Sequence, residues 1–406
     1  MSTNFLNLPG VRIQEVRLGA PPIAGVGTST AGFVGKSPDP ARFPNVLRQV
    51  TSVDQFFADY IRDPTDPDNE AKGAQENTNL GKAVIGFFQN GGNECFIVNT
   101  VDEAPGNIKK GLDLLATREE IDIIAAPGVI DTTTYDALRD QAAATSNRFA
   151  ILDPPAKVDD IAKLQNGGPL RPKDSIWAAF YYPRIQITPV LKKDKKDLED
   201  DPTLQKPATR EKVFAPPSGH IAGLYARTDG ERGVHKAPAN VSLAGALAVE
   251  DLITDTQQNV LNNDSVNIIR AFPAGPTVFG ARTLQVDGKS IDINFRYISV
   301  RRLTTFIEQS LRTGLRFAVF EPNNLALRQI ITRSVRGFLD GVFRDGALFG
   351  ATADEAYYVR FPDPFNTDTE RALGRLTLEV GIRPAPPAEF IIIRIGVLDR
   401  PANATT

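Results

Sequence analysis

The sequence is poor in the side chains that most enzymes and metal sites use. Its 406 residues include one cysteine, Cys95, and two histidines, His220 and His235. A single cysteine excludes an intrachain disulfide and a cysteine-based metal cluster, and two histidines without a supporting carboxylate motif predict no zinc site. The formal net charge of −3 gives no basic field that would attract nucleic acid or anionic lipid. This composition is typical of a chain that is positioned and joined rather than of a catalyst.

Long apolar runs are also missing. No stretch reaches the ~18 apolar residues that a membrane-spanning helix needs, and the best run, 390–398, is short and includes Arg394. The first ten residues have neither the basic start nor the apolar core of a signal peptide. We therefore expect a chain that is made in the cytoplasm without a signal peptide, does not insert into a membrane, and needs another route for any later export.

Two nucleotide-binding motifs are incomplete. Residues 35–37 (Gly-Lys-Ser) resemble the end of a phosphate-binding loop, and residues 25–27 (Gly-Val-Gly) resemble the start of a dinucleotide fingerprint. Both patterns require a glycine at the position of Thr30. We therefore assign no cofactor-binding residue.

A serine and a histidine lie close together at Ser218 and His220, but the Gly-x-Ser-x-Gly pattern of a nucleophile elbow is absent. We interpret 216–219 as a tight turn and His220 as a packed or hydrogen-bonded residue, and we assign no catalytic residue. The arginine pair 301–302 is interpreted as an exposed, solvated face. Because no aromatic residues are interleaved with basic ones, no nucleic-acid partner is expected.

Proline (30 residues) and glycine (32 residues) are plentiful, and between them apolar runs typical of buried strands alternate with helical patterns. Ser52 is the predicted N-cap of the first helix. The predicted strands are 31–34, 96–98, 121–125 and 149–152, and the predicted helices are 52–61, 80–89, one that ends at 112–117, and 135–145. Such alternation implies an α/β fold with a mainly parallel sheet covered on both faces. Polar inserts near 63–79 and 190–212 are predicted to be exposed; for the charge run 192–201 a docking patch is an alternative.

The last third predicts two amphipathic helices, 300–311 and 322–343, followed by a strand over 376–382. The longer helix has an apolar stripe formed by Leu327, Ile331, Phe338 and Val342. Its only charged residues between 323 and 339 are Arg328, Arg333 and Arg336. We interpret these arginines as a solvated face, with an acidic protein surface as the alternative partner.

The two ends of the chain share one design, a predicted strand joined to the body by prolines. Residues 11–17 precede Pro21 and Pro22, and residues 390–398 follow prolines at 384, 386 and 387. Strands that carry unpaired backbone groups pair with a neighbouring subunit or within their own chain, and both alternatives stay open. The residues assigned to inter-subunit pairing are Val11, Ile13, Val16, Phe390, Ile392, Arg394, Ile395 and Val397.

Several long blocks resemble contractile tail sheath proteins, which occur in contractile-tailed phages, R-type pyocins and phage-like extracellular injection systems. The central block is 215–229 followed by 233–240, and the others are 9–11, 280–284, 296–303, 320–323, 346–350 and 387–391. Tryptophans common in the family are replaced by Phe279, Phe295 and His235. The inserts fall where such sheaths vary.

The resemblance implies a subtilisin-like α/β middle domain without catalysis, an α+β C-terminal sheath domain facing an inner tube, and extended N- and C-terminal β-strand arms. The implied limits are 1–22 for the N-terminal arm, 23–275 for the middle domain, 276–383 for the C-terminal domain and 384–406 for the C-terminal arm.

The implied function is that of a structural subunit that polymerises with copies of itself around an inner tube protein. Its contraction would drive that tube through a target membrane, in an assembled particle that includes baseplate and terminal cap proteins and requires no cofactor. Arg328, Arg333 and Arg336 become candidate tube contacts. The alternatives are a static structural or adaptor protein and a serine hydrolase.

Overall fold

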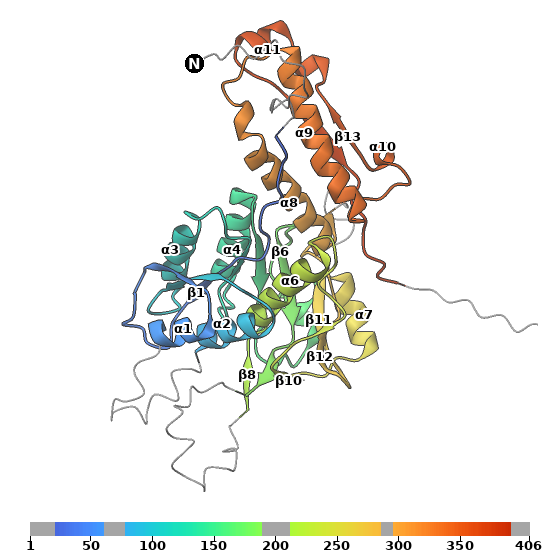
Figure 1. Ribbon diagram of the computed structural model, residues 1–406. Helices are drawn as coiled ribbons and strands as arrows, with labels where there is room; N and C mark the ends of the chain where they lie inside the picture. Colours follow the sequence, from blue (N-terminus) through green and yellow to red (C-terminus); the bar gives the residue numbers. More distant parts are fainter. Residues whose placement is uncertain (1–20, 61–77, 189–211, 286–294, 391–406) are drawn as a thin grey trace, which may run out of the picture. The chain divides into compact units, whose positions relative to one another are not determined.

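The computed structural model describes residues 21–60, 78–188, 212–285 and 295–390 (Figure 1). The chain divides into two compact units. The α/β unit comprises Val26–Gln309 and Pro384–Thr406, and the helical unit comprises Met1–Gly25 and Ser310–Arg383. The predicted strand 11–17 lies outside the described residues, as do 391–398 and nearly all of both inserts. The predicted domain limits stay a prediction.

A nine-stranded sheet forms the centre of the α/β unit within the described residues. Six neighbouring strands are parallel, and antiparallel strands complete both edges. The order is β2 (Leu47–Val50), β3 (Cys95–Asn99), β1 (Ala31–Gly35), β4 (Ile123–Ala125), β5 (Phe149–Leu152), β6 (Ala178–Tyr182), β11 (Val266–Phe272), β12 (Gly275–Val278) and β9 (Val241–Ser242). The strands β1, β3, β4, β5 and β6 are buried along their whole length, which explains their continuous apolar sequences.

Helices cover both faces of this sheet, as the alternating sequence pattern predicts. One core contains side chains of α1 (Val53–Tyr60), α2 (Asn79–Gln89) and α6 (Ser218–Arg232). The opposite core contains side chains of α3 (Pro105–Leu115), α4 (Thr132–Thr145) and α7 (Asp255–Asn263). The mainly parallel α/β fold is therefore confirmed. A smaller antiparallel sheet adds β10 (Ala246–Val249), β7 (Ile185–Ile187) and β8 (Val213–Ala215).

Local capping sets several helix boundaries. The Ser52 hydroxyl accepts from the Gln55 N–H at 3.1 Å, which confirms the predicted N-cap of α1. Thr78 caps α2 in the same way, and Gly91 follows that helix with φ +104°, a value that favours glycine. β4 begins at Ile123, two residues later than predicted, because its pairing with β1 starts at that residue.

The helical unit is built around α9 (Leu325–Arg344), which begins later than predicted because Asn324 caps it by accepting from the Leu327 N–H. The buried side of α9 includes the predicted Leu327, Ile331 and Val342 together with Val335 and Leu339, and Phe338 is half-buried. The remaining elements are α10 (Ala353–Ala356), β13 (Tyr357–Arg360), α11 (Asp368–Ala372), β14 (Glu379–Ile382) and short 3₁₀ turns at Arg316–Ala318 and Asp363–Phe365. The strand predicted over 376–382 forms only in β14, paired with β13. The boundary between the two units falls within α8 (Ile298–Gly314).

Candidate functional site

Ser218 and Asp153 form a buried cap at the start of α6. Ser218 is completely buried, and its Oγ donates to Asp153 Oδ2 at 2.6 Å. The Ser218 backbone N–H donates to Asp153 Oδ1 at 2.8 Å, so a carboxylate just after β5 accepts at the positive end of the helix. The tight turn predicted for 216–219 is wrong, because this remote carboxylate allows the helix to begin at Ser218.

His220 is packed between α2 and α6, as predicted. Its side chain is 1% exposed, and neither ring nitrogen has a hydrogen-bond partner among the described residues. Burial lowers its pKa to about 4. The helices approach so closely that a Cβ on Gly86 would lie 2.2 Å from the His220 ring. A nucleophile–base pair needs a hydrogen bond between serine and histidine, and the Ser218 proton is instead directed to Asp153.

A buried ion pair joins α6 to α8 within the α/β unit. Arg302 donates to Asp229 through Nη1 at 2.9 Å and through Nη2 at 2.5 Å, and each side chain is 5% exposed. Nη2 also donates to the Thr28 carbonyl at 2.8 Å, and the Thr28 hydroxyl donates to Asp229 at 2.7 Å. Burial lowers the pKa of Arg302, but the Asp229 charge and hydrogen bonds raise it overall. The exposed face predicted for Arg301 and Arg302 is therefore wrong, because both side chains are buried.

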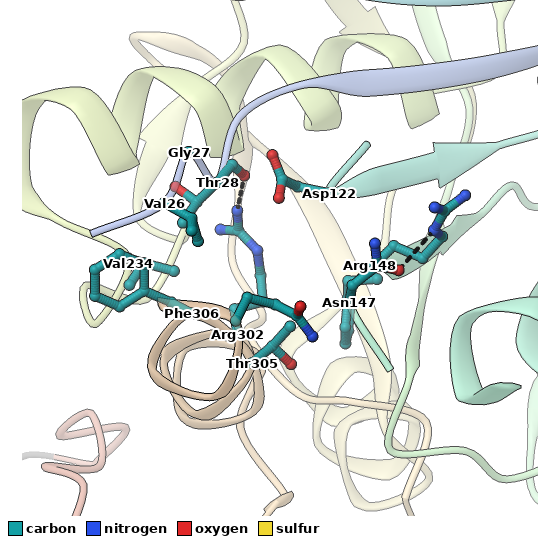
Figure 2. Close-up of a pocket in the computed structure, with 12 residues that line it drawn as sticks. Val26, Gly27, Thr28, Asp122, Asn147, Arg148, Val234, Arg302, Thr305 and Phe306 are labelled. Atoms are coloured by element: carbon teal, nitrogen blue, oxygen red, sulfur yellow. Dashed lines mark hydrogen bonds between the residues drawn. The ribbon is translucent and has the colours of Figure 1, made fainter. Parts of the chain in front are cut away.

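The pocket drawn in Figure 2 is lined by the Arg302 side chain, and Asp122 and Arg148 belong to the same lining. Arg148 donates to the carbonyls of Leu115 and Arg118 and to the Asn147 side chain, and burial lowers its pKa to about 10. Burial also raises the pKa of Asp122 well above its usual value. Because protein groups already satisfy both guanidinium groups, the pocket is a structural cluster rather than a binding site for an anion.

A second buried arginine, Arg282, binds Glu389, which directly precedes the predicted C-terminal strand. Arg282 is 2% exposed, and its guanidinium donates to the Glu389 carboxylate through Nε at 2.9 Å and through Nη2 at 2.8 Å. Asn262 donates to the same carboxylate at 2.9 Å, and the Tyr297 hydroxyl donates at 3.0 Å. Burial alone would raise the pKa of Glu389, but these hydrogen bonds and the Arg282 charge hold it below its usual value. The next residue, Phe390, is 71% exposed and is the only predicted pairing residue that the structure describes.

Ile23, which directly follows the predicted N-terminal arm, belongs to the other unit. Ile23 is 8% exposed, and it packs so closely on Gly314 of α8 that a Cβ at Gly314 would lie 2.6 Å from its side chain. Val11, Ile13 and Val16 lie outside the described residues, as does the rest of the C-terminal set, Ile392, Arg394, Ile395 and Val397.

The three candidate arginines of α9 differ in their surroundings. Arg333 and Arg336 are exposed, and neither forms an ion pair within the part of the chain that the structure describes. Arg328 is half-buried and lies over the Phe361 ring at 5.7 Å. The helix therefore presents two accessible positive charges one turn apart.

No group of three or more His, Cys, Asp or Glu side chains that could hold a metal ion occurs among the described residues. In the same residues, we find no helix with the length and apolar character required to cross a membrane.

Comparisons with known proteins give a consistent result. The phage tail sheath protein central domain matches residues 106–284, and the phage tail sheath C-terminal domain matches residues 291–397. A putative prophage major tail sheath protein of Pseudomonas aeruginosa is 27% identical over 201 residues, which are 48% of this chain and 48% of that protein. The helical sheath of the anti-feeding prophage in its contracted state is 30% identical, with a TM-score of 0.70 over 96% of this chain and 99% of that chain. The chain belongs to the contractile tail sheath family.

A further solved sheath supports this assignment. The sheath complex of PVC, an extracellular contractile injection system, in its contracted state is 28% identical, with a TM-score of 0.73 over 97% of this chain and 98% of that chain. The chain spans about half of the length of the curated relatives it matches, 48% of one and 38% of another. The family predicted from the sequence blocks is confirmed, and this sheath protein is a structural protein rather than an enzyme.

Sequence reasoning missed both buried arginine clusters of this sheath protein. Arg282 and Glu389 lie in blocks that resemble the family, and so do Asp229 and Arg302. The blocks were therefore a signal that these residues matter. Nothing in them says that Arg282 pairs with Glu389 across 107 positions, or Arg302 with Asp229 across 73.

Proposed function

We propose that this sheath subunit polymerises with copies of itself into a helical sleeve around an inner tube, and that contraction of the sleeve drives the tube through a target membrane. The observation that carries the proposal is its similarity, over at least 96% of the chain, to two sheaths solved in the contracted state. Baseplate and terminal cap proteins complete the particle, a phage tail or an extracellular injection device. The subunit is made in the cytoplasm, binds no nucleic acid and does not itself enter the membrane.

The arms link the subunits by strand exchange. The two ends supply backbone donors and acceptors to a sheet shared with neighbours, and the residues assigned to it are Val11, Ile13 and Val16 at one end and Phe390, Ile392, Arg394, Ile395 and Val397 at the other. The position of Glu389 and the exposed Phe390 support this role, because Glu389 is held by Arg282 and the next side chain is available for contacts. Reciprocal arms give each subunit several simultaneous links, which raises the strength of the assembly.

The energy for contraction comes from the sheath itself. If each subunit buries a further 100–200 Å² of apolar surface in the contracted packing, it gains about 2.5–5 kcal/mol at ~25 cal/mol/Å². A cooperative change multiplies that gain along the sleeve. This mechanism fits a sequence that has no complete nucleotide-binding motif.

The C-terminal domain, residues 276–383, faces the tube in this proposal, and Arg328, Arg333 and Arg336 contact acidic tube residues. The accessible charges of Arg333 and Arg336 support such a contact. The middle domain, residues 23–275, is of the subtilisin-like type, with a parallel sheet between two helical layers.

Electron microscopy of the purified full-length protein tests the proposal. We expect tubes in two states that differ in length and diameter. Rigid rings or tubes of a single length and diameter would favour a static structural protein, and monomers at all concentrations would contradict self-assembly.

A further inference from the structure

Protein donors satisfy the Glu389 carboxylate, which follows the prolines at 384, 386 and 387. Arg282, Asn262 and Tyr297 together provide donors to both of its oxygens. The Arg282 Nη1 also donates to the Asn262 carbonyl at 2.6 Å. A bidentate arginine fork fixes direction as well as distance, because both of its bonds lie in one plane.

Arg282 is itself fixed to the central sheet. Its backbone N–H donates to the Asn267 side chain at 2.7 Å, and the same side chain donates to the Arg282 carbonyl at 2.8 Å. Asn267 belongs to β11, is completely buried, and donates also to the Phe180 carbonyl of β6 at 3.2 Å. A continuous series of hydrogen bonds therefore runs from two parallel strands, through Arg282, to Glu389.

We infer that Glu389 is the anchor of the C-terminal arm: its capture by Arg282, Asn262 and Tyr297 fixes the point and direction in which the arm leaves the α/β unit toward a neighbouring subunit. This inference rests on the proposed function of the arm. A fixed exit keeps the arm strand at a high effective concentration near its acceptor, and it passes tension on the arm to the sheet. Glu389 is thus a positioning residue for assembly.

The test compares the full-length protein with E389Q, which keeps the shape of the side chain but removes the charge that Arg282 binds. We expect the concentration needed for polymerisation, measured by sedimentation and negative-stain microscopy, to rise at least about tenfold. The melting temperature should also fall, because the substitution leaves the buried Arg282 guanidinium without its carboxylate, so polymerisation of E389Q is compared at a temperature below its melting.

E250Q is the matched control. Glu250 accepts a bidentate pair from Arg184 at 2.7 and 2.6 Å in the same unit, so the substitution breaks equivalent chemistry away from the arm root. E250Q should polymerise at the wild-type concentration. Equal polymerisation of E389Q and wild type, or an equal loss in E389Q and E250Q, overturns the anchor.

Y297F is a milder variant, and its polymerisation threshold tests the anchor role of Glu389 even if E389Q does not fold. It removes one hydrogen bond to Glu389 and leaves the ion pair, so the polymerisation threshold should rise by less than in E389Q, with wild-type melting. A wild-type threshold in Y297F, when E389Q is unfolded, overturns the inference. If the wild-type protein itself forms no tubes, the proposed function fails, and that result is distinct from failure of the anchor.

Discussion

Replacing Asp229 by asparagine should lower the stability of the α/β unit far more than removal of a surface charge does. Arg302 and Asp229 are each 5% exposed, so the substitution leaves a guanidinium charge in the interior without its carboxylate. Removal of one partner of a buried pair costs about 3–5 kcal/mol. We expect a decrease of that size in the free energy of unfolding of D229N, measured by guanidinium denaturation of the subunit at neutral pH.

The double variant D229N/R302M separates this effect from simple loss of packing. Removing the Arg302 charge together with the Asp229 charge should recover part of the stability that D229N loses. The free-energy change of the double variant should therefore differ by about 1–3 kcal/mol from the sum of the two single changes. The control is E120Q, which breaks the exposed pair between Arg118 and Glu120 at 3.5 Å and should change stability by less than about 1 kcal/mol. A loss below about 1 kcal/mol in D229N, or strictly additive effects of the two substitutions, would refute the reasoning.

Three further predictions concern packing, pH and the tube. G219A should destabilise the subunit by about 1–3 kcal/mol or more in chemical denaturation, because a Cβ at Gly219 would lie 2.1 Å from a backbone oxygen of α2; unchanged stability would contradict the close helix contact. His220 titrates near 4 when folded and near 6.5 when unfolded, so its contribution is complete above pH 6.5 and decreases by up to about 3 kcal/mol as the pH falls toward 4. Asp153, whose pKa burial raises to about 6, opposes this trend because its contribution rises as the pH falls below 6. Denaturation of H220L and wild type across pH 7.5–4.5 isolates the histidine, and parallel curves would contradict its burial as a neutral group. The double variant R333E/R336E should bind purified inner tube protein at least about tenfold more weakly, with unchanged melting, and wild-type binding would remove these arginines from the tube contact.

The features that the sequence predicts correctly depend on neighbouring residues. The buried strand at 31–34 and the cap at Ser52 follow from patterns a few residues long. The exposure of Arg333 and Arg336 likewise follows from helical periodicity. These local patterns, together with the alternation of strands and helices, were sufficient for the α/β fold.

The wrong predictions depend on residues far apart in the chain. The polar side of its helix predicts a solvated Arg302, but the side chain is buried and paired with Asp229 of another helix. The two prolines before Ser218 predict a turn, whereas the carboxylate that caps the helix belongs to the distant Asp153. No short-range pattern contains such pairings.

The two arm roots belong to different compact units. Ile23, which follows the predicted N-terminal arm, packs against Gly314 in the helical unit, whereas Glu389 of the predicted C-terminal arm is held by Arg282 in the α/β unit. In a sleeve linked through these arms, each subunit is therefore attached to one set of neighbours through its helical unit and to another through its α/β unit. Any rearrangement between the two units inside one subunit would change the spacing of its neighbours. The length of the whole sleeve would therefore depend on the conformation of each single chain.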